Sequence, residues 1–304
     1  MKYLLEHITK YAFCLILINS VIFPQDVGVK VNIKKSIFLT GEPIFVEIEF
    51  SNLSSDTFYL HPAEWSIHLI DEAENRIPRT YFIDWGPSKW KPTFEPGDQI
   101  EFFKELTDLF GKKVNSSLKP VLPVLPVGNY YLYIEGKTKT RYDILKKIQK
   151  VTNFKSNEIE LEIKDPIGVE KKVYDLLRLA YDNEYSKRQL NEAEEIYQRI
   201  IDNYPQSLYL SRASYFFALM YRFSKQEPQK ILSYKRYKKL MQKHPDSYFS
   251  IWGLQNAQQL NSILYGEDKS LLLEEIINLY PDTKVSKKAV KLLKSLDSEN
   301  NVRK

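Results

Sequence analysis

The sequence predicts a two-domain β + α fold, in which an N-terminal antiparallel β-sandwich (residues 25–165) precedes a C-terminal domain of α-helical hairpins (residues 168–296). Three observations support this prediction. Apolar residues alternate with a period of two through much of the first half of the 304-residue chain. In the second half they recur with the helical period of 3.6, and one short phrase returns three times. Between the halves, residues 164–168 contain a proline and a glycine, which break the last strand and mark the joint.

Residues 1–24 have the layout of a signal peptide. Lysines lie near the start, a short apolar run covers residues 11–18, and the small residue Ser20 follows it. The run is shorter than the roughly 20 residues that span a bilayer, so we expect a secreted chain with no transmembrane span after cleavage. The alternatives are an uncleaved anchor and a buried first strand. Cleavage would remove Cys14, the single cysteine, and with it any disulfide or thiolate chemistry.

The clearest strand of the first half covers residues 44–50, where Ile44, Val46, Ile48 and Phe50 alternate with other side chains. Clusters of Gly, Pro, Asn, Asp and Ser separate it from its neighbours. Short alternating strands with frequent turns are typical of an antiparallel sandwich. Further strands are expected at residues 27–33, 57–60, 65–70, 99–106, 130–134 and 159–163.

Residues 81–90 do not fit a minimal sandwich, because they place Tyr81, Trp85 and Trp90 in a loop that contains Gly and Pro. Exposed rings beside polar groups would stack on a sugar or grip a peptide. The competing interpretation is that Trp85 and Trp90 fold back and close one end of the sandwich.

Residues 137–155 form a basic stretch that includes Lys146, Lys147 and Lys150 and a single acid. Apolar residues recur within it at helical spacing. It predicts either a short amphipathic helix that meets an anionic partner or a membrane surface, or a solvated loop whose apolar side rests on the helical domain.

The repeated phrase of the second half explains how its helices end. Its prolines, Pro205, Pro245 and Pro281, cannot continue a helix interior, so each ends a hairpin. The hydroxyl two residues later can cap the next helix. Helices are expected at residues 169–181, 190–204, 207–223, 228–243, 247–264 and 268–279, followed by a basic capping helix at 285–296 and a tail at 297–304.

These residues carry two resemblances. Thr40-Gly41-Glu42-Pro43 before a strand, with similar turns later in the first half, resembles bacterial extracytoplasmic immunoglobulin-like domains, which implies a spacer or docking module and no catalytic residue. The phrase Tyr-Pro-x-Ser resembles degenerate tetratricopeptide repeats of bacterial envelope proteins, which implies TPR-like protein–protein interaction. The third copy departs from that family, because Lys269 and Leu273 stand where a small residue and an aromatic are expected.

The sequence contains no recognisable pattern for chemistry, so we expect no enzyme, no cofactor and no metal site. His61 and His68 are seven residues apart, which is no recognised ligand spacing. The acidic pairs at residues 194–195 and 274–275 are expected to solvate helix faces. Residues 167–304 hold 23 Lys and Arg against 17 Asp and Glu, a net charge of +6, but the basic residues are dispersed, and we expect no nucleic acid partner.

The sequence therefore predicts an exported protein of the periplasm, the extracellular space or the bacterial envelope, which binds or scaffolds a protein or peptide partner through the helical repeats. Two alternatives place binding on the sandwich. One is a glycan-binding module that uses Trp85 and Trp90, and the other is an accessory or inhibitory subunit of an envelope hydrolase.

Overall fold

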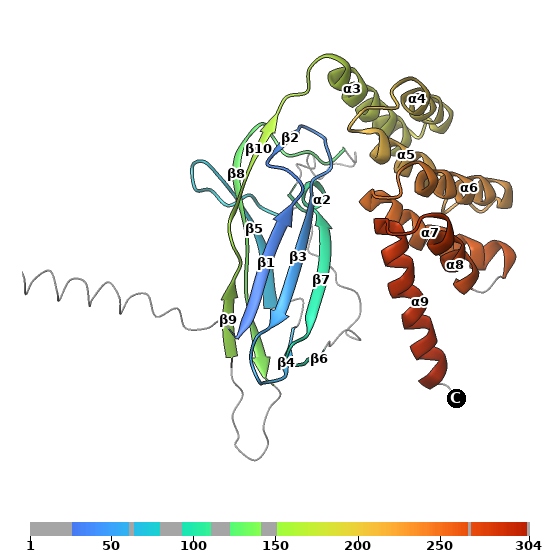
Figure 1. Ribbon diagram of the computed structural model, residues 1–304. Coiled ribbons are helices and arrows are strands. Elements are labelled where there is room, and N and C mark those ends of the chain that lie inside the picture. The colour runs from blue at the N-terminus through green and yellow to red at the C-terminus, as the bar shows by residue number, and fades with distance from the viewer. Residues whose placement is uncertain are drawn as a thin grey trace, which may run out of the picture.

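The structure, a computed structural model, describes residues 26–60, 64–79, 93–110, 122–140, 151–266 and 269–302. A β region is followed by a helical region, as predicted, and the two lie side by side with their connection at one end (Figure 1). Several residues singled out in the sequence lie outside the described ranges. They are the signal peptide of residues 1–24, Tyr81, Trp85 and Trp90, and Lys146, Lys147 and Lys150.

The β region consists of two sheets that enclose one apolar core. The first sheet is antiparallel with the order β1 (Val27–Ile33), β3 (Phe45–Asn52) and β7 (Gln99–Glu105). The second follows the order β2 (Ile37–Leu39), β10 (Ile159–Lys164), β8 (Gly128–Thr140), β4 (Phe58–Tyr59) and β6 (Thr93–Phe94), while β5 (Trp65–Asp71) and β9 (Val151–Lys155) also pair with β8. Its pairs are antiparallel except β2 with β10.

Strand β3 shows why the alternation was informative. Val46, Ile48 and Phe50 are fully buried in the core, and Ile44 is buried just before the strand, as expected. Because successive side chains point to opposite faces, the other residues of β3 form an outer face. That outer face carries Phe45 and the acids at positions 47 and 49, and it is turned toward the helices (Figure 1).

The basic stretch of residues 137–155 has strands at both described ends. Strand β8 extends to Thr140, and Val151 begins β9, with Lys139 opposite Val151 in the register. The apolar residues 144–148, whose spacing suggested a helix, lie outside the described ranges. The choice between a short helix and a loop there therefore stays a prediction.

The helical region begins, within the described residues, with two helix pairs, α3 (Gly168–Asp182) with α4 (Leu190–Asn203) and α5 (Leu210–Leu219) with α6 (Glu227–Lys243). Then follow α7 (Tyr248–Tyr265), α8 (Lys269–Leu279) and α9 (Lys284–Val302), of which α7 packs mainly against α6, and α8 mainly against α9. Helix α9 continues past residue 296, where the sequence placed the start of a tail. A short helix α2 (Leu106–Phe110) follows β7.

The predicted faces of the helices are largely the buried ones. Val173, Leu177 and Ala180 of α3 lie in the core of the first hairpin. Val169, predicted on the same face, is 61% exposed, because the first turn of α3 precedes the packed part of the hairpin.

The repeated phrase forms the same turn three times. In each copy the aromatic or histidine before the proline donates its N–H to the carbonyl four residues earlier: Tyr204 to Ile200 (3.1 Å), His244 to Leu240 (2.9 Å) and Tyr280 to Ile276 (3.1 Å). The hydroxyl residue then accepts from a backbone N–H: Ser207 from Tyr209 (3.2 Å), Ser247 from Phe249 (3.2 Å) and Thr283 from Ser286 (3.3 Å). The capping prediction is confirmed at Ser247, which is the N-cap of α7, and Thr283 accepts from the first turn of α9 in the same way. It is wrong at Ser207, because α5 begins only at Leu210 and has no side-chain cap.

Replacing Ser247 with alanine is expected to lower the free energy of unfolding by about 1 kcal/mol, because an N–H at the start of α7 loses its acceptor. Urea unfolding measures the change. Ser247→Asn is the matched control, since an Asn side chain can cap as well, and it should retain most of the stability. Equal losses in the two variants would contradict the capping role.

A short π-helix, η2 (Asn183–Lys187), follows α3 and places Glu184 inside the first hairpin. The hydroxyl of Tyr197 donates to Glu184 Oε2 at 2.9 Å. Burial raises the pKa of Glu184 to about 7, although hydrogen bonds from Tyr197 and Tyr185 act in the opposite direction. Folding therefore stabilises the neutral form of the Glu184 carboxyl relative to its charged form.

The stability of the chain should depend on Glu184 between pH 4.5 and about 7. Its folded pKa lies above its unfolded value, so its contribution is complete below pH 4.5 and is lost as pH rises through about 7. Glu184→Gln should flatten that decline, while the exposed Glu195→Gln on α4 should leave it unchanged. Urea unfolding across this pH range tests the expectation, and an unaltered slope in Glu184→Gln would refute it.

Candidate binding surface at the domain junction

The outer face of the three-stranded sheet packs against the helical region through aromatic side chains. The ring of Phe45 lies 4.5 Å from that of Tyr248, 5.3 Å from Phe249 and 5.5 Å from Trp252. Phe103 of β7 contacts Tyr248 as well, with ring centroids 5.0 Å apart. Aromatic burial of this kind is the dominant apolar contribution to a protein interface, so the two halves form one joined body.

A buried arginine adds polar contacts at the other end of the junction. Arg212 of α5 is completely buried; its Nη1 donates to the Gly41 carbonyl at 2.8 Å, and its Nη2 lies 3.1 Å from Glu105 Oε1. Burial raises the pKa of Glu105 to about 7, while Arg212 opposes that rise. A buried guanidinium with a carboxylate fixes the geometry of the junction.

Two further ion pairs join the sheet to α9. Lys284 Nζ lies 2.7 Å from Glu47 Oε1, and Lys291 Nζ lies 2.7 Å from Glu101 Oε2. Tyr248 donates its hydroxyl to Glu47. Burial alone would raise the pKa of Glu47, but the hydrogen bonds from Lys284 and Tyr248 and the charge of Lys284 bring it below its ordinary value.

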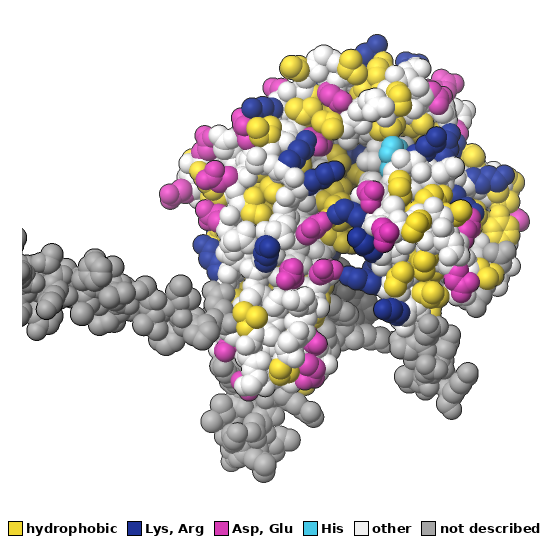
Figure 2. All heavy atoms as spheres, viewed as in Figure 1, with side chains coloured by type: hydrophobic (Ala, Val, Ile, Leu, Met, Phe, Trp, Pro, Cys, Tyr) yellow, Lys and Arg dark blue, Asp and Glu magenta, His cyan; other side chains and the backbone are white. Residues whose placement is uncertain are grey.

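Between these contacts lies a groove of about 820 Å³, called the junction groove below. Figure 2 shows it as a hollow between the sheet and the helices, with acidic side chains on the sheet side and basic ones on the helix side. The sheet wall contains Glu47, Glu49, Glu101 and Phe103, the helix wall contains Lys284, Lys287, Lys288, Lys291 and Lys294, and Ile251, Ile277 and Val290 supply apolar surface.

The electrostatics of the groove suit binding. Burial, and to a lesser extent the charge of the neighbouring Lys291, lower the pKa of Lys288. The acids of the opposite wall lie on neighbouring strands, since Glu49 is directly opposite Glu101 in the sheet register. A ligand in the groove would meet charges of opposite sign on its two sides and apolar surface between them.

The junction changes which part of the helical region is free. The main hypothesis from the sequence placed the recognition surface on the hairpins, and its two alternatives placed it on the sandwich. In the structure α5, α7 and α9 contact the chain's own sheet through Arg212, Tyr248 and Lys284, so this face of the hairpins is partly covered. The sheet is thus one wall of the candidate surface.

The polar residues that the sequence analysis discussed have structural partners. His68 stacks on Tyr133 and lies 3.1 Å from Glu135, while His61 is outside the described ranges. Glu194 pairs with Arg236, so it links α4 to α6 and does not merely solvate a face. Within the described part of the chain, no group of three or more His, Cys, Asp or Glu is placed to hold a metal ion.

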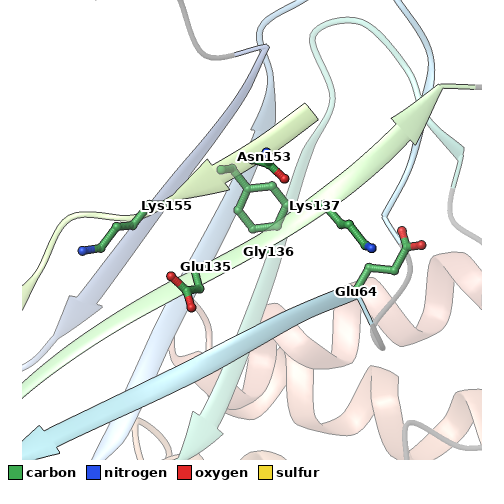
Figure 3. A pocket seen from close by; sticks show the side chains of 7 residues that line it. Glu64, Glu135, Gly136, Lys137, Asn153 and Lys155 are labelled. Carbon is green, nitrogen blue, oxygen red and sulfur yellow. The ribbon is translucent and has the colours of Figure 1, made fainter. Parts of the chain in front are cut away.

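A crevice on the second sheet is another hollow of the β region (Figure 3). Gly136 of β8 is one of its lining residues and lets the neighbouring chain pack closely, since a Cβ there would lie 2.6 Å from the Glu64 carbonyl oxygen. Its acids already have cationic partners: Glu64 pairs with Lys139 at 2.7 Å, and Glu135 lies 3.5 Å from Arg76. We therefore assign the crevice to close strand packing and not to ligand binding.

The sequence contained a signal for the junction groove that periodicity analysis did not use. The lysines of α9 follow one another at spacings of three, one, three and three residues, which places them along one helix face. The outer face of β3 and β7 likewise combines acids with Phe45 and Phe103. Neither pattern identifies the surface that it contacts, because nothing in the local sequence shows that the helix face and the sheet face meet.

Comparison with known proteins gives little to add. No protein family model and no curated protein matches this chain. A solved structure, described as the putative ApaA protein from Bordetella pertussis, shows a TM-score of 0.28 and 12% sequence identity, over 47% of this chain and 98% of that chain. A TM-score of this size transfers neither a fold nor a function. The helices among the described residues include none that is long and apolar enough to cross a membrane.

Proposed function

We propose that this chain is an exported, non-enzymatic binding protein, which holds an extended segment of a partner protein in the junction groove. One observation carries the proposal: a groove of about 820 Å³ with apolar surface and two walls of opposite charge is built jointly by the sheet and α9. Export is supported by the signal-like pattern of residues 1–24.

The dimensions of the helix wall support an extended polypeptide as the occupant. The lysines run from Lys284 to Lys294, a distance of about 15 Å at 1.5 Å per residue. At about 3.3 Å per residue, a segment of about five extended residues matches that length. Its acidic side chains would face α9 and its basic ones would face Glu49 and Glu101.

The ionisation of Glu47 favours binding over catalysis. A general acid or base needs a pKa near the working pH. The pKa of Glu47 is moved in the opposite direction, below its ordinary value, by Lys284 and Tyr248. The carboxylate therefore stays charged and paired, which suits a permanent wall of a binding groove.

We also propose a finer assignment of the two halves, as an immunoglobulin-like β-sandwich and TPR-like repeats. Two sheets around one core support the first part. The thrice-repeated turn at Pro205, Pro245 and Pro281 supports the second. In this assignment the sandwich docks onto the repeats and completes the recognition surface.

Site-specific photo-crosslinking of the full chain tests the groove in cells that produce the protein. A photoreactive amino acid is placed at Lys287, which is exposed and lines the groove, or at Glu274, which is exposed on α8 and does not line it. We expect a discrete adduct with a partner protein from position 287 only.

The decisive control fills the groove without moving the crosslinker. Val290→Trp should abolish the adduct from position 287, because the larger side chain occupies space inside the groove. An adduct that persists in this variant, or that forms equally from position 274, would exclude the groove as the binding site. Unfolding midpoints confirm that each variant is folded.

A further inference from the structure

A second groove lies entirely within the helical region, between the first and second hairpins. Its volume is about 460 Å³, within the range of about 300–1,000 Å³ that is usual for ligand pockets. Buried apolar side chains line it, namely Leu210 and Phe217 of α5 and Leu240 of α6. We call it the hairpin groove.

The edge of the hairpin groove is basic. Lys239 and Lys243 of α6 are exposed, one helical turn apart, and Arg236 lies one turn before them on the same face. Asp202 of α4 is the acid among the lining residues. Burial and Lys243 lower the pKa of His244, so near pH 7 the positive charge comes from the lysines and Arg236.

Arg236 is fixed in place by the hairpins themselves. It donates to the Phe217 carbonyl at 3.0 Å, its guanidinium lies 3.5 Å from the centroid of the Phe217 ring, and it pairs with Glu194. Its charge is therefore largely compensated from within the protein. Lys239 and Lys243 are left as the cations that a ligand would meet at the edge.

The repeat explains why two grooves exist. Ile201, Pro205, Leu210 and Ser214 of the hairpin groove stand 76 residues before Ile277, Pro281, Ser286 and Val290 of the junction groove. Each set surrounds one copy of the repeated phrase, where the proline turns the chain between helices. The third copy faces the sheet, whereas the described residues that line the groove at the first copy all belong to the helical region.

We propose that the hairpin groove is a second docking site, which binds a short acidic segment of a partner protein in which apolar side chains alternate with carboxylates. Apolar side chains would cover Leu210, Phe217 and Leu240, and carboxylates would pair with Lys239 and Lys243. A phosphate polymer fits less well, because it offers little to the apolar lining and meets Asp202 at the edge. The site does not depend on the junction groove.

Fluorescence anisotropy with the full chain tests the proposal. The probe is a labelled synthetic peptide in which Leu and Phe alternate with Glu, and it is compared with the same peptide carrying Lys in place of Glu. We expect binding of the acidic peptide only, weakened at least about tenfold in Lys239→Glu/Lys243→Glu and weakened by added salt.

Two further variants separate the groove from general charge. Lys225→Glu/Lys235→Glu changes the net charge equally at exposed positions outside the groove and should alter affinity less than about twofold. Ser214→Trp fills the groove without changing charge and should abolish binding. Absence of binding, equal weakening in both lysine pairs, retained binding in Ser214→Trp, or tighter binding of oligothymidylate would each overturn the proposal.

Discussion

Replacing Arg212 with methionine is expected to lower the free energy of unfolding by about 3–5 kcal/mol, because the change leaves a buried carboxylate without its cation. Glu105 remains buried inside the junction, and the Gly41 carbonyl loses a donor. Methionine keeps much of the side-chain volume, so the loss reports charge and hydrogen bonding more than an empty cavity. Urea unfolding of the full chain at pH 8 measures it.

The pH dependence of this loss has a definite sign. The pKa of Glu105 is already raised by burial, and removal of Arg212 removes a group that opposes the rise. Glu105 then ionises less readily in the folded chain. The stability that its neutral form contributes to the folded chain is complete below pH 4.5 and is lost as pH increases. Arg212→Met should therefore be more damaging at pH 8 than at pH 5.

A double variant provides the control. Glu105→Gln added to Arg212→Met removes the unpaired carboxylate and should recover part of the stability at pH 8, because replacing both partners costs less than removing one. A loss below about 0.5 kcal/mol in Arg212→Met, the size usual for a surface substitution, would show that the junction does not depend on this pair.

Elements governed by local chemistry were the ones that the sequence predicted well. The turns at Pro205, Pro245 and Pro281 follow from a missing N–H and a nearby hydroxyl, both of which are visible in the sequence. The burial of Val46, Ile48 and Phe50 follows from the alternation of a strand. These features depend on neighbours within a few residues, so a single sequence contains the information needed to place them.

The junction could not be predicted, because its contacts join residues far apart in the chain. Arg212 and Gly41 are separated by 171 residues, and Tyr248 and Glu47 by 201. Periodicity shows that Tyr248 and Trp252 are on a helix, but not that a sheet covers them. The charge of Arg212 also pointed to the surface, since an arginine is rarely buried without a partner and the partner is invisible locally.

Because the sheet covers part of the helical region, the choice of experiment for binding also depends on the junction. Separating the halves at Pro166, the proline of the joint, would be a simple way to decide which half binds a partner. The structure argues against that experiment, because it would expose Arg212 and Glu105 together with Phe45 and its aromatic contacts. A fragment with these groups exposed would bind other proteins through its cut surface. Point variants of the full chain are the sharper tool.

Gly41→Ala is expected to cost about 2–5 kcal/mol, the second large effect at the junction. Gly41 has φ +78°, a left-handed conformation that costs about 1–2 kcal/mol with a side chain. An added Cβ would also lie 2.6 Å from Cδ2 of the Tyr174 ring, and such overpacking costs about 1–3 kcal/mol more. The ring of Tyr174 is packed beside Tyr209, so it has little freedom to move.

Gly97→Ala separates the two causes. Gly97 has φ +83°, almost the same conformation, but a Cβ there would meet nothing within 4 Å. It should therefore show only the backbone cost of about 1–2 kcal/mol. Because Gly41 also presents its carbonyl to Arg212, its variant should in addition speed amide hydrogen exchange in α5, whereas the Gly97 variant should not. Equal losses in both variants would mean that the contact of Gly41 with Tyr174 does not hold the halves together.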